Sequence, residues 1–226
     1  MRSRTFFAGI IVACLLASAG SVAVAKDPAV ASVSPDVALA RLKAGNARFV
    51  ANPVSKGQPT AARRAETART QHPFAIIVGC ADSRTSPELV FDQNLGDLFV
   101  VRTAGNLIDD HGLGSIEYAV GHFGTRLIVV LGHASCGAVK AALASATAPG
   151  HVNSLVRDIQ PAVEAAKTEK GDTLANTVKA NTRLMAEKIG KEAELGEHKA
   201  EVRIVTGYYD LETGLVEWPD EGKTKR

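Results

Sequence analysis

The sequence predicts an α/β fold in which helices flank a central, mainly parallel β-sheet, with an N-terminal helical arm and a C-terminal strand and hairpin. Two apolar runs of strand length, residues 73–78 (PFAIIV) and 127–131 (LIVVL), each lead into a glycine followed by a cysteine or a histidine. Such continuous runs are typical of strands buried on both faces. Helical patterns separate the apolar runs, and strands that alternate with helices indicate a parallel sheet.

The helical arm is predicted over residues 34–50. Ser34 fits the N-cap position, Pro35 fits the first helical position, and Leu39 and Leu42 begin an apolar spacing typical of a helix. A loop over residues 51–60 and a polar helix or extended arm over residues 61–71 are expected to follow.

The rest of the chain alternates between strands and helices. The expected strands lie within residues 72–84, 97–106, 125–137 and 200–210, and the last one leads into a hairpin over residues 211–218. The expected helices begin at Ser86-Pro87-Glu88 or cover residues 112–124, 137–148, 152–168 and 173–193. No internal repeat or low-complexity linker divides this region, so residues 26–226 are expected to form a single domain.

Residues 1–25 have the layout of a secretory signal peptide. Arg2 and Arg4 precede an apolar core over residues 6–16, and Ala23-Val24-Ala25 provides a small-x-small cleavage site. The apolar run of the whole segment is short and is broken by Gly and Ser, which disfavours a retained membrane anchor. Cys14 lies in a segment similar to a lipoprotein processing box, but the apolar stretch before it is too short to favour lipidation. We therefore expect an exported, periplasmic protein without membrane association after cleavage.

Charge and cysteine content narrow the function. The formal net charge is +2 and no basic block is present, which disfavours nucleic acid as a partner. Of the three cysteines, Cys14 would leave with the signal peptide, so Cys80 and Cys136 remain. In an oxidising compartment two cysteines commonly form a disulfide. A non-catalytic, disulfide-stabilised binding protein is therefore one interpretation.

The neighbours of the two cysteines favour a metal site instead. The carboxyl ends of parallel strands form the ligand-binding edge of an open α/β sheet, and Cys80 and His133 each end an expected strand. Cys136 follows where a turn leads into a helix, and a helix N-terminus favours the thiolate. Cys, His and Cys form a natural Zn²⁺ set that leaves one position open, as in catalytic sites. Taken alone, His133 could be a histidine of the protein core, and Cys80 could be a small buried apolar residue.

Asp82 and Arg84 extend this pattern. If residues 80–84 are extended, Cys80, Asp82 and Arg84 point to the same side. The arginine would hold the carboxylate away from the metal and keep it ionised, so that Asp82 could accept a hydrogen bond from zinc-bound hydroxide. The plainer alternatives are that Asp82 caps a turn and that Arg84 is a surface charge.

These motifs resemble those of the β-class carbonic anhydrases, which carry Cys-x-Asp-x-Arg and His-x-x-Cys; here they read CADSR and GHASCGAV. The similarity covers most of the expected mature chain, including GNARF, FDQNLGDLFVVRTAGN and YYDLETGLVEW. The resemblance implies one Zn²⁺ per subunit on Cys80, His133 and Cys136, with Asp82 and Arg84 as a catalytic pair. In regulated members of the family the aspartate closes on zinc, so Asp82 is also a conditional metal ligand.

The resemblance also implies a substrate and an assembly. Gln71 falls on a substrate-binding position, and Phe99 and Tyr118 fall on the apolar wall of the substrate site. The expected reaction is the reversible hydration of CO₂ to bicarbonate and a proton, in a homodimer or higher homo-oligomer whose active sites are partly built by the neighbouring subunit. A hydrolase acting on CS₂ or COS on the same scaffold is the alternative, because a resemblance fixes a scaffold better than a substrate.

Overall fold

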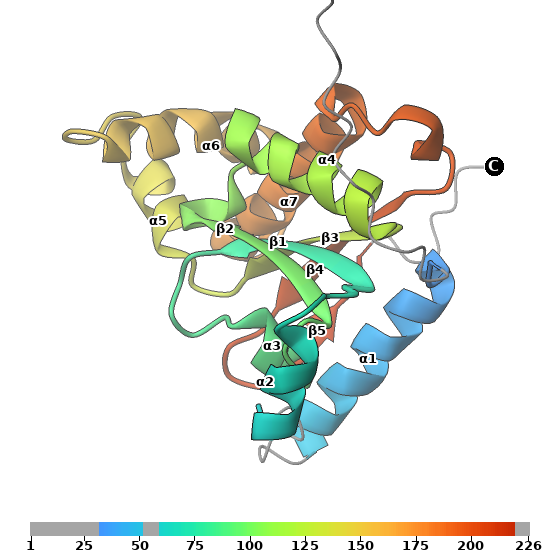
Figure 1. Cartoon of the computed structure of the whole chain (residues 1–226). Helices are drawn as coiled ribbons and strands as arrows, with labels where there is room; N and C mark the ends of the chain where they lie inside the picture. Colours follow the sequence, from blue (N-terminus) through green and yellow to red (C-terminus); the bar gives the residue numbers. More distant parts are fainter. Residues whose placement is uncertain (1–31, 52–58, 220–226) are drawn as a thin grey trace, which may run out of the picture.

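The structure is a computed structural model that describes residues 32–51 and 59–219 (Figure 1). The predicted signal peptide and most of the predicted loop 51–60 lie outside the described residues. The strands are β1 (Ala75–Cys80), β2 (Leu98–Thr103), β3 (Leu127–His133), β4 (Arg203–Tyr209) and β5 (Val216–Glu217). The helices are α1 (Pro35–Ala51), α2 (Ala61–Thr67), α3 (Pro87–Val90), α4 (Asp110–Phe123), α5 (Gly137–Ala144), α6 (Val152–Ala166) and α7 (Thr173–Glu192), with 3₁₀ turns at Ala104–Asn106 and Gly196–His198.

The strands form one sheet in the order β2-β1-β3-β4-β5. The first four strands are parallel, and β5 pairs antiparallel with β4 as the second strand of the hairpin. The predicted α/β class and mainly parallel sheet are therefore confirmed. Because β1 pairs with β2 on one side and with β3 on the other, the strand order reverses beside β1, and ligands in such sheets bind at the carboxyl side of this reversal.

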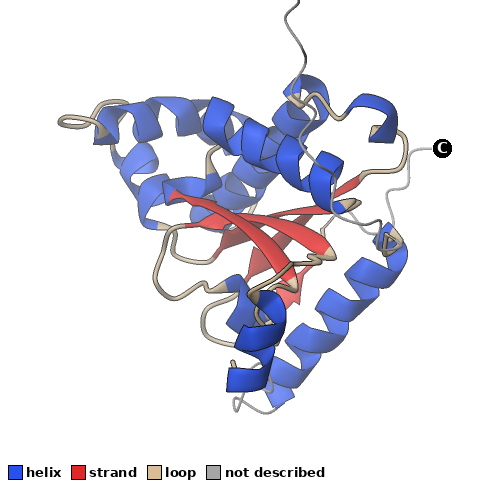
Figure 2. Ribbon diagram, viewed as in Figure 1, coloured by secondary structure: helices blue, strands red, loops and turns tan. Residues whose placement is uncertain are grey.

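Helices cover both faces of the sheet (Figure 2). Ile76 and Val78 of β1 belong to a core cluster with apolar residues of α4, α5, α6 and α7. Ile77 belongs to a second cluster, with Leu42 of α1 and Phe91 directly after α3. In Figure 1, α4, α6 and α7 lie on one side of the strands and α1 and α3 on the other. Burial on both faces explains why the strands read as continuous apolar runs.

Several predicted boundaries differ from those in the structure. The strand expected over 97–106 ends at Thr103, because Gly105 takes a left-handed conformation (φ 72°) and residues 104–106 form a 3₁₀ turn. The helix expected over 137–148 ends at Ala144, where Ser145 turns to an extended conformation. The predicted closure of α4 by Gly124 is confirmed, since this residue is its left-handed C-cap. Among the described helices, none is long and apolar enough to cross a membrane.

Asn46 connects the first described helix to the last hairpin. Its side-chain Nδ2 donates to the carbonyl oxygens of Val90 (3.1 Å) and Gly214 (2.8 Å), and its Oδ1 accepts from the backbone N–H of Val216 (2.9 Å). The side chain is buried, so these three bonds satisfy polar atoms that water cannot reach.

Candidate metal centre

Cys80, His133 and Cys136 converge at the carboxyl edge of the sheet. Cys80 ends β1, His133 ends β3, and Cys136 is the N-cap residue of α5. Their side-chain donor atoms all lie within 4.8 Å of one another. Only 5% of the Cys80 surface and 1% of the surfaces of His133 and Cys136 are exposed. Soft donors from two distant segments of the chain thus meet in a site shielded from solvent.

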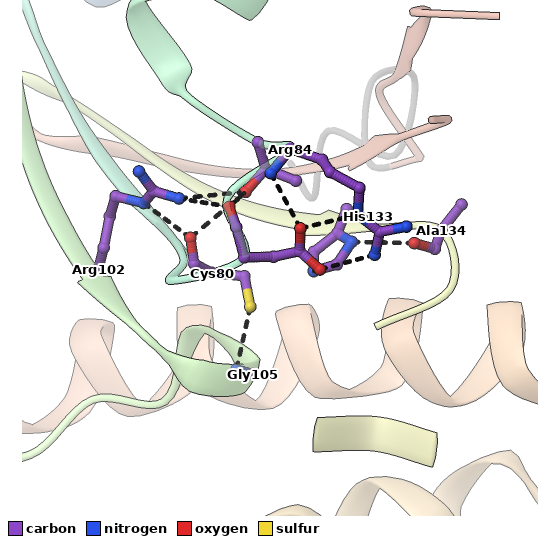
Figure 3. Close-up of polar contacts among 8 residues, drawn as sticks. Cys80, Arg84, Arg102, Gly105, His133 and Ala134 are labelled. Atoms are coloured by element: carbon purple, nitrogen blue, oxygen red, sulfur yellow. Dashed lines mark hydrogen bonds and ion pairs between the residues drawn. The ribbon is translucent and has the colours of Figure 1, made fainter. Parts of the chain in front are cut away.

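The His133 ring is oriented with one nitrogen available. Its Nδ1 lies 2.9 Å from the carbonyl oxygen of Ala134, and because a carbonyl can only accept, Nδ1 carries the proton (Figure 3). Nε2 is then the nitrogen with the free lone pair, and it is buried without a hydrogen-bond partner in the described structure. A buried imidazole nitrogen without a partner is costly unless it binds something.

The surrounding elements fix where the donors lie. Gly132, directly before His133, lets α7 approach β3 closely: a Cβ atom there would lie 2.7 Å from methyl groups of both Thr182 and Val178. On the β1 side, the backbone N–H of Gly105 donates to Cys80 Sγ at 3.3 Å (Figure 3). The 3₁₀ turn that ends β2 therefore contacts the thiol directly.

The two thiols ionise as a pair. The pKa of Cys80 is lowered, mainly because the Cys136 side chain hydrogen-bonds to it and also because the N–H groups of Asp82 and Gly105 do so. The same contact with Cys80, followed by burial, raises the pKa of Cys136. The first-turn N–H groups of α5 do lower the pKa of Cys136, as predicted, but the neighbouring sulfur outweighs them. The lowering by these N–H groups agrees in direction with the effect predicted for the helix N-terminus.

Asp82 and Arg84 face each other, but not on an extended strand as predicted. β1 ends at Cys80, and the backbone N–H of Thr85 bonds the carbonyl oxygen of Asp82 in a turn. Within this turn Asp82 Oδ1 accepts from the backbone N–H of Arg84 (3.0 Å) and from its Nε (2.9 Å), while Oδ2 accepts from Nη2 (2.7 Å). Aspartate side chains commonly bond a backbone N–H two residues later, and this bond favours a turn over an extended strand. Asp82 and Arg84 are therefore paired as predicted, but within a turn.

The Arg84 side chain is the main reason that the pKa of Asp82 lies well below its usual range. Asp82 Oδ2 also lies 4.0 Å from His133 Nε2, so an ionised carboxylate stands beside the three donors. Its oxygens bond Arg84, and the convergent donor group in the described structure comprises Cys80, His133 and Cys136 without Asp82.

Sequence reasoning missed Arg102 and Thr85. Arg102 Nε donates to the carbonyl oxygen of Cys80 (2.7 Å), and its Nη2 donates to that of Asp82 (2.6 Å). The Thr85 hydroxyl contacts the same two oxygens, at 3.3 and 3.0 Å. The available signal was a charged residue inside the otherwise apolar strand LFVVRT.

The residues expected to bind substrate do not lie beside the donor group. They are Gln71, Phe99 and Tyr118. Phe99 pairs with Ile76, four residues before Cys80 and thus about 13 Å away along the strand. The rings of Phe99 and Tyr118 contact each other, with centroids 6.4 Å apart, and Tyr118 is 48% exposed. Gln71 and Tyr118 line one pocket of about 440 Å³. The structure therefore groups these residues with one another and not with the donors of the same chain.

The donor set fits Zn²⁺. Two buried free cysteines and a buried histidine nitrogen without a partner, all within 4.8 Å, match the soft N/S ligands that zinc prefers. Three protein ligands would leave a fourth position for water or substrate.

Comparisons with known proteins agree with this geometry. The family model described as carbonic anhydrase matches residues 75–216. Carbonic anhydrase 2 of Mycobacterium tuberculosis is 52% identical over 136 residues, which are 58% of this chain and 66% of that protein. The carbonic anhydrase of Mycolicibacterium smegmatis is 55% identical over 127 residues, 56% of this chain and 61% of that protein. The match thus spans just under two thirds of these curated relatives.

Solved structures share the fold. The β-carbonic anhydrase of Coccomyxa, solved in complex with acetazolamide, superposes with a TM-score of 0.62 and 27% identity over 84% of this chain and 86% of that one. A β-carbonic anhydrase of Sordaria macrospora, described as tetrameric, gives 0.63 and 22% identity over 81% and 95%. The family match covers well over half of the sequence and includes all three donors. The chain belongs to the β-carbonic anhydrase family.

Proposed function

We propose that this protein catalyses the reaction CO₂ + H₂O ⇌ HCO₃⁻ + H⁺ with one Zn²⁺ held by Cys80, His133 and Cys136. The observation that carries the proposal is the convergence of these donors beside the Asp82–Arg84 pair. Bound by this set, Zn²⁺ would lower the pKa of a water molecule and so supply a nucleophile near neutral pH.

Asp82 and Arg84 would orient that water. An ionised carboxylate can only accept hydrogen bonds, so Asp82 would accept one from the water and direct the oxygen lone pair toward the carbon of CO₂. The new C–O bond gives bicarbonate, and the displaced proton passes to solvent. Arg84 occupies both carboxylate oxygens and thereby holds Asp82 in place and ionised.

Gln71, Phe99 and Tyr118 would serve the site of a second subunit. Phe99 lies at the opposite end of the strands, about 13 Å from Cys80 of its own chain, and the exposed Gln71 and Tyr118 are grouped with it. We propose a homodimer or higher homo-oligomer in which this surface covers the partner's donors. The Sordaria macrospora enzymes are described as tetrameric, which supports an assembly of more than one chain.

The test is stopped-flow CO₂ hydration beside zinc analysis. We expect about one zinc per chain, loss of activity on chelation and recovery when zinc is restored. Asp82→Asn should keep zinc but lower kcat/KM about 10²-fold, the low end for a group that handles a proton in the transition state. Asp172→Asn is the matched control, because Asp172 is an exposed carboxylate that accepts from Leu174 N–H and Ala175 N–H at the start of α7.

Two outcomes would contradict the proposal. A zinc-loaded protein that converts CS₂ or COS faster than CO₂ would be a hydrolase on this scaffold. A protein without zinc, and with Cys80 and Cys136 joined as a disulfide, would be a binding protein and not an enzyme.

We also propose that residues 1–25 direct export and that residues 26–226 form the mature periplasmic domain. The support is the order of basic, apolar and small residues in the first 25 positions. N-terminal sequencing of the protein from the periplasmic fraction should begin at Lys26. Recovery of uncleaved chain from the cytoplasm alone would contradict export.

A further inference from the structure

Arg102 has an unusual position and an unusual set of acceptors. It lies in β2, where it pairs with Gly79 of β1, and its side chain is half-buried at the carboxyl edge of the sheet. Its donors reach across to the chain that follows β1: Nε to the carbonyl oxygen of Cys80 (2.7 Å) and Nη2 to that of Asp82 (2.6 Å) (Figure 3). A third contact, from Nη2 to the Thr85 hydroxyl, is 3.5 Å long.

The two carbonyl acceptors belong to Cys80, a proposed metal ligand, and to Asp82, the proposed catalytic carboxylate. The carbonyl groups of Cys80 and Asp82 lie on either side of Ala81, so one guanidinium fixes the orientation of both peptide units. The direction of each side chain follows from its backbone, and therefore Cys80 Sγ and the Asp82 carboxylate are aimed together. The Thr85 hydroxyl contacts the same oxygens from within the turn, at 3.3 and 3.0 Å.

The Asp82–Arg84 pair needs such support. The side chain of Arg84 is 53% exposed, and ion pairs this open to water contribute little by themselves. Hydrogen bonds from a charged donor to backbone carbonyls at a half-buried site contribute more. The pair is therefore held in its turn less by its own attraction than by the backbone that Arg102 fixes.

We propose that Arg102 is a positioning residue: it clamps residues 80–85 so that Asp82 faces Arg84 while the Cys80 thiol stays within the donor group. This inference rests on the proposed function for its effect on activity, but its structural part stands without it. Arg102 acts through the backbone of Cys80 and Asp82, since the hydrogen bonds of its guanidinium within residues 32–51 and 59–219 go to backbone oxygens and a hydroxyl.

The test compares Arg102→Gln with Arg126→Gln. Arg126 is a buried arginine that also donates to backbone carbonyls, those of Val120 (2.9 Å) and Thr125 (3.3 Å), but it lies at the start of β3, away from the donors. Amide hydrogen exchange is measured for the peptide covering residues 81–86, which contains the Arg84 and Thr85 N–H groups bonded to Asp82. Exchange there should rise in Arg102→Gln and stay at the wild-type rate in Arg126→Gln.

Activity provides the second readout. Arg102→Gln should lower kcat/KM for CO₂ hydration by about 10–100-fold, as is typical when a residue supporting a metal site is lost, while Arg126→Gln stays within about twofold at a temperature where both are folded. Guanidinium added to Arg102→Ala should restore part of the activity, and urea, its neutral analogue, should not. If Arg102→Ala does not fold, Arg102→Lys replaces it and should show exchange between that of the wild type and that of Arg102→Gln.

The outcomes separate the two proposals. Wild-type exchange at residues 81–86 in Arg102→Gln would overturn the clamp, whatever the activity. Equal losses of activity in Arg102→Gln and Arg126→Gln would also overturn it, because general destabilisation would then be the cause. A wild-type protein that does not hydrate CO₂ would overturn the proposed function alone, and faster exchange in Arg102→Gln would still support the clamp.

Discussion

The two ends of the sheet differ in how far their side chains are buried and held by contacts within the chain. At the carboxyl ends of β1 and β3, Cys80 and His133 are buried and held by contacts within the chain. About 13 Å away along the strands, near the start of β2, the half-buried ring of Phe99 contacts Tyr118, which is 48% exposed. The first region has its geometry fixed before anything binds, whereas the second presents a surface that one chain leaves uncovered.

The difference follows from what each region has to do. Metal ligands need a fixed geometry, which a buried edge with many backbone contacts supplies. A surface that acts on a partner must remain exposed in the single chain. In the proposed homo-oligomer, the exposed surface of one chain would cover the donors of another.

The largest effect is expected from removing a donor. Cys136→Ser replaces a soft thiol by a hydroxyl that binds zinc poorly, so zinc content and CO₂ hydration should both fall to background. Metal analysis of the purified variant and stopped-flow kinetics measure this. Ser135→Gly is the control, because glycine tolerates the left-handed conformation of Ser135 (φ 57°) and leaves all three donors in place. A Cys136→Ser variant with full zinc and activity would show that the donor set is wrong.

The division between the two ends can be tested by mixing variants. Gln71→Ala should lower kcat/KM about tenfold, the loss of one hydrogen bond, and Asp82→Asn about 10²-fold. In an equimolar, co-refolded mixture about half of the dimers contain both variants, and one site in each of these is intact, so about a quarter of wild-type activity should return.

If Gln71 serves its own chain, no mixed dimer contains an intact site. The mixture would then show only the average of the two variants, about one twentieth of wild-type activity. That result would refute a site shared between subunits.

A smaller effect on zinc affinity is expected from a substitution in the 3₁₀ turn after β2. Gly105→Ala places a side chain at φ 72°, which costs about 1–2 kcal/mol, and its Cβ would lie 3.0 Å from Ile159 Cδ1. The turn should shift and weaken the N–H bond to Cys80 Sγ, which lowers both stability and zinc affinity.

Gly124→Ala is its matched control. It has nearly the same backbone angle (φ 69°) and more space, since Ser32 Cβ at 3.8 Å is the nearest atom to a Cβ there. It should lose stability in thermal melts but keep zinc affinity. Equal zinc affinity in the two variants would show that the contact between Gly105 and Cys80 is unimportant.

The smallest effect concerns the hairpin beyond β4. Asp210 Oδ1 accepts from the N–H groups of Thr213 and Glu212, and the bond from Thr213 is the main reason that the pKa of Asp210 is lowered. Its contribution to stability is therefore complete above the unfolded value near pH 4 and is lost as the pH falls through the lower folded value. Asp210→Asn should melt at most about 2–4 °C below wild type at pH 7, with a smaller difference at pH 3. An unchanged difference at pH 3 would contradict this.

The sequence predicted the fold and the donor group because both depend on local patterns. Apolar runs ending in Gly-Cys and Gly-His identify buried strands and their carboxyl ends, and the topology of a parallel sheet brings those ends together. The start of α1 at Pro35 likewise follows from the fixed φ of proline, and the end of α4 at Gly124 follows from the ability of glycine to adopt a left-handed conformation.

The remaining features of the site depend on contacts between side chains and backbone that a sequence pattern does not specify. The role of Arg102 follows from the register that places β2 beside β1, which the sequence alone does not specify. The turn after Cys80 follows from Asp82 bonding the N–H of Arg84, a local preference of aspartate that the extended interpretation overlooked. The ionisation of the two thiols depends on their contact with each other, which the sequence alone does not specify.

Asn46 also constrains when the molecule can complete its folding. Its three bonds join α1 to α3 and to a hairpin 170 residues away, so α1 is anchored by residues that are synthesised much later than the helix itself. Until the hairpin emerges, Asn46 lacks two partners, and each buried polar group left unsatisfied costs about 1–3 kcal/mol. We therefore expect vectorial synthesis to form the strands and their helices first, with the anchoring of α1 as a late step of high contact order.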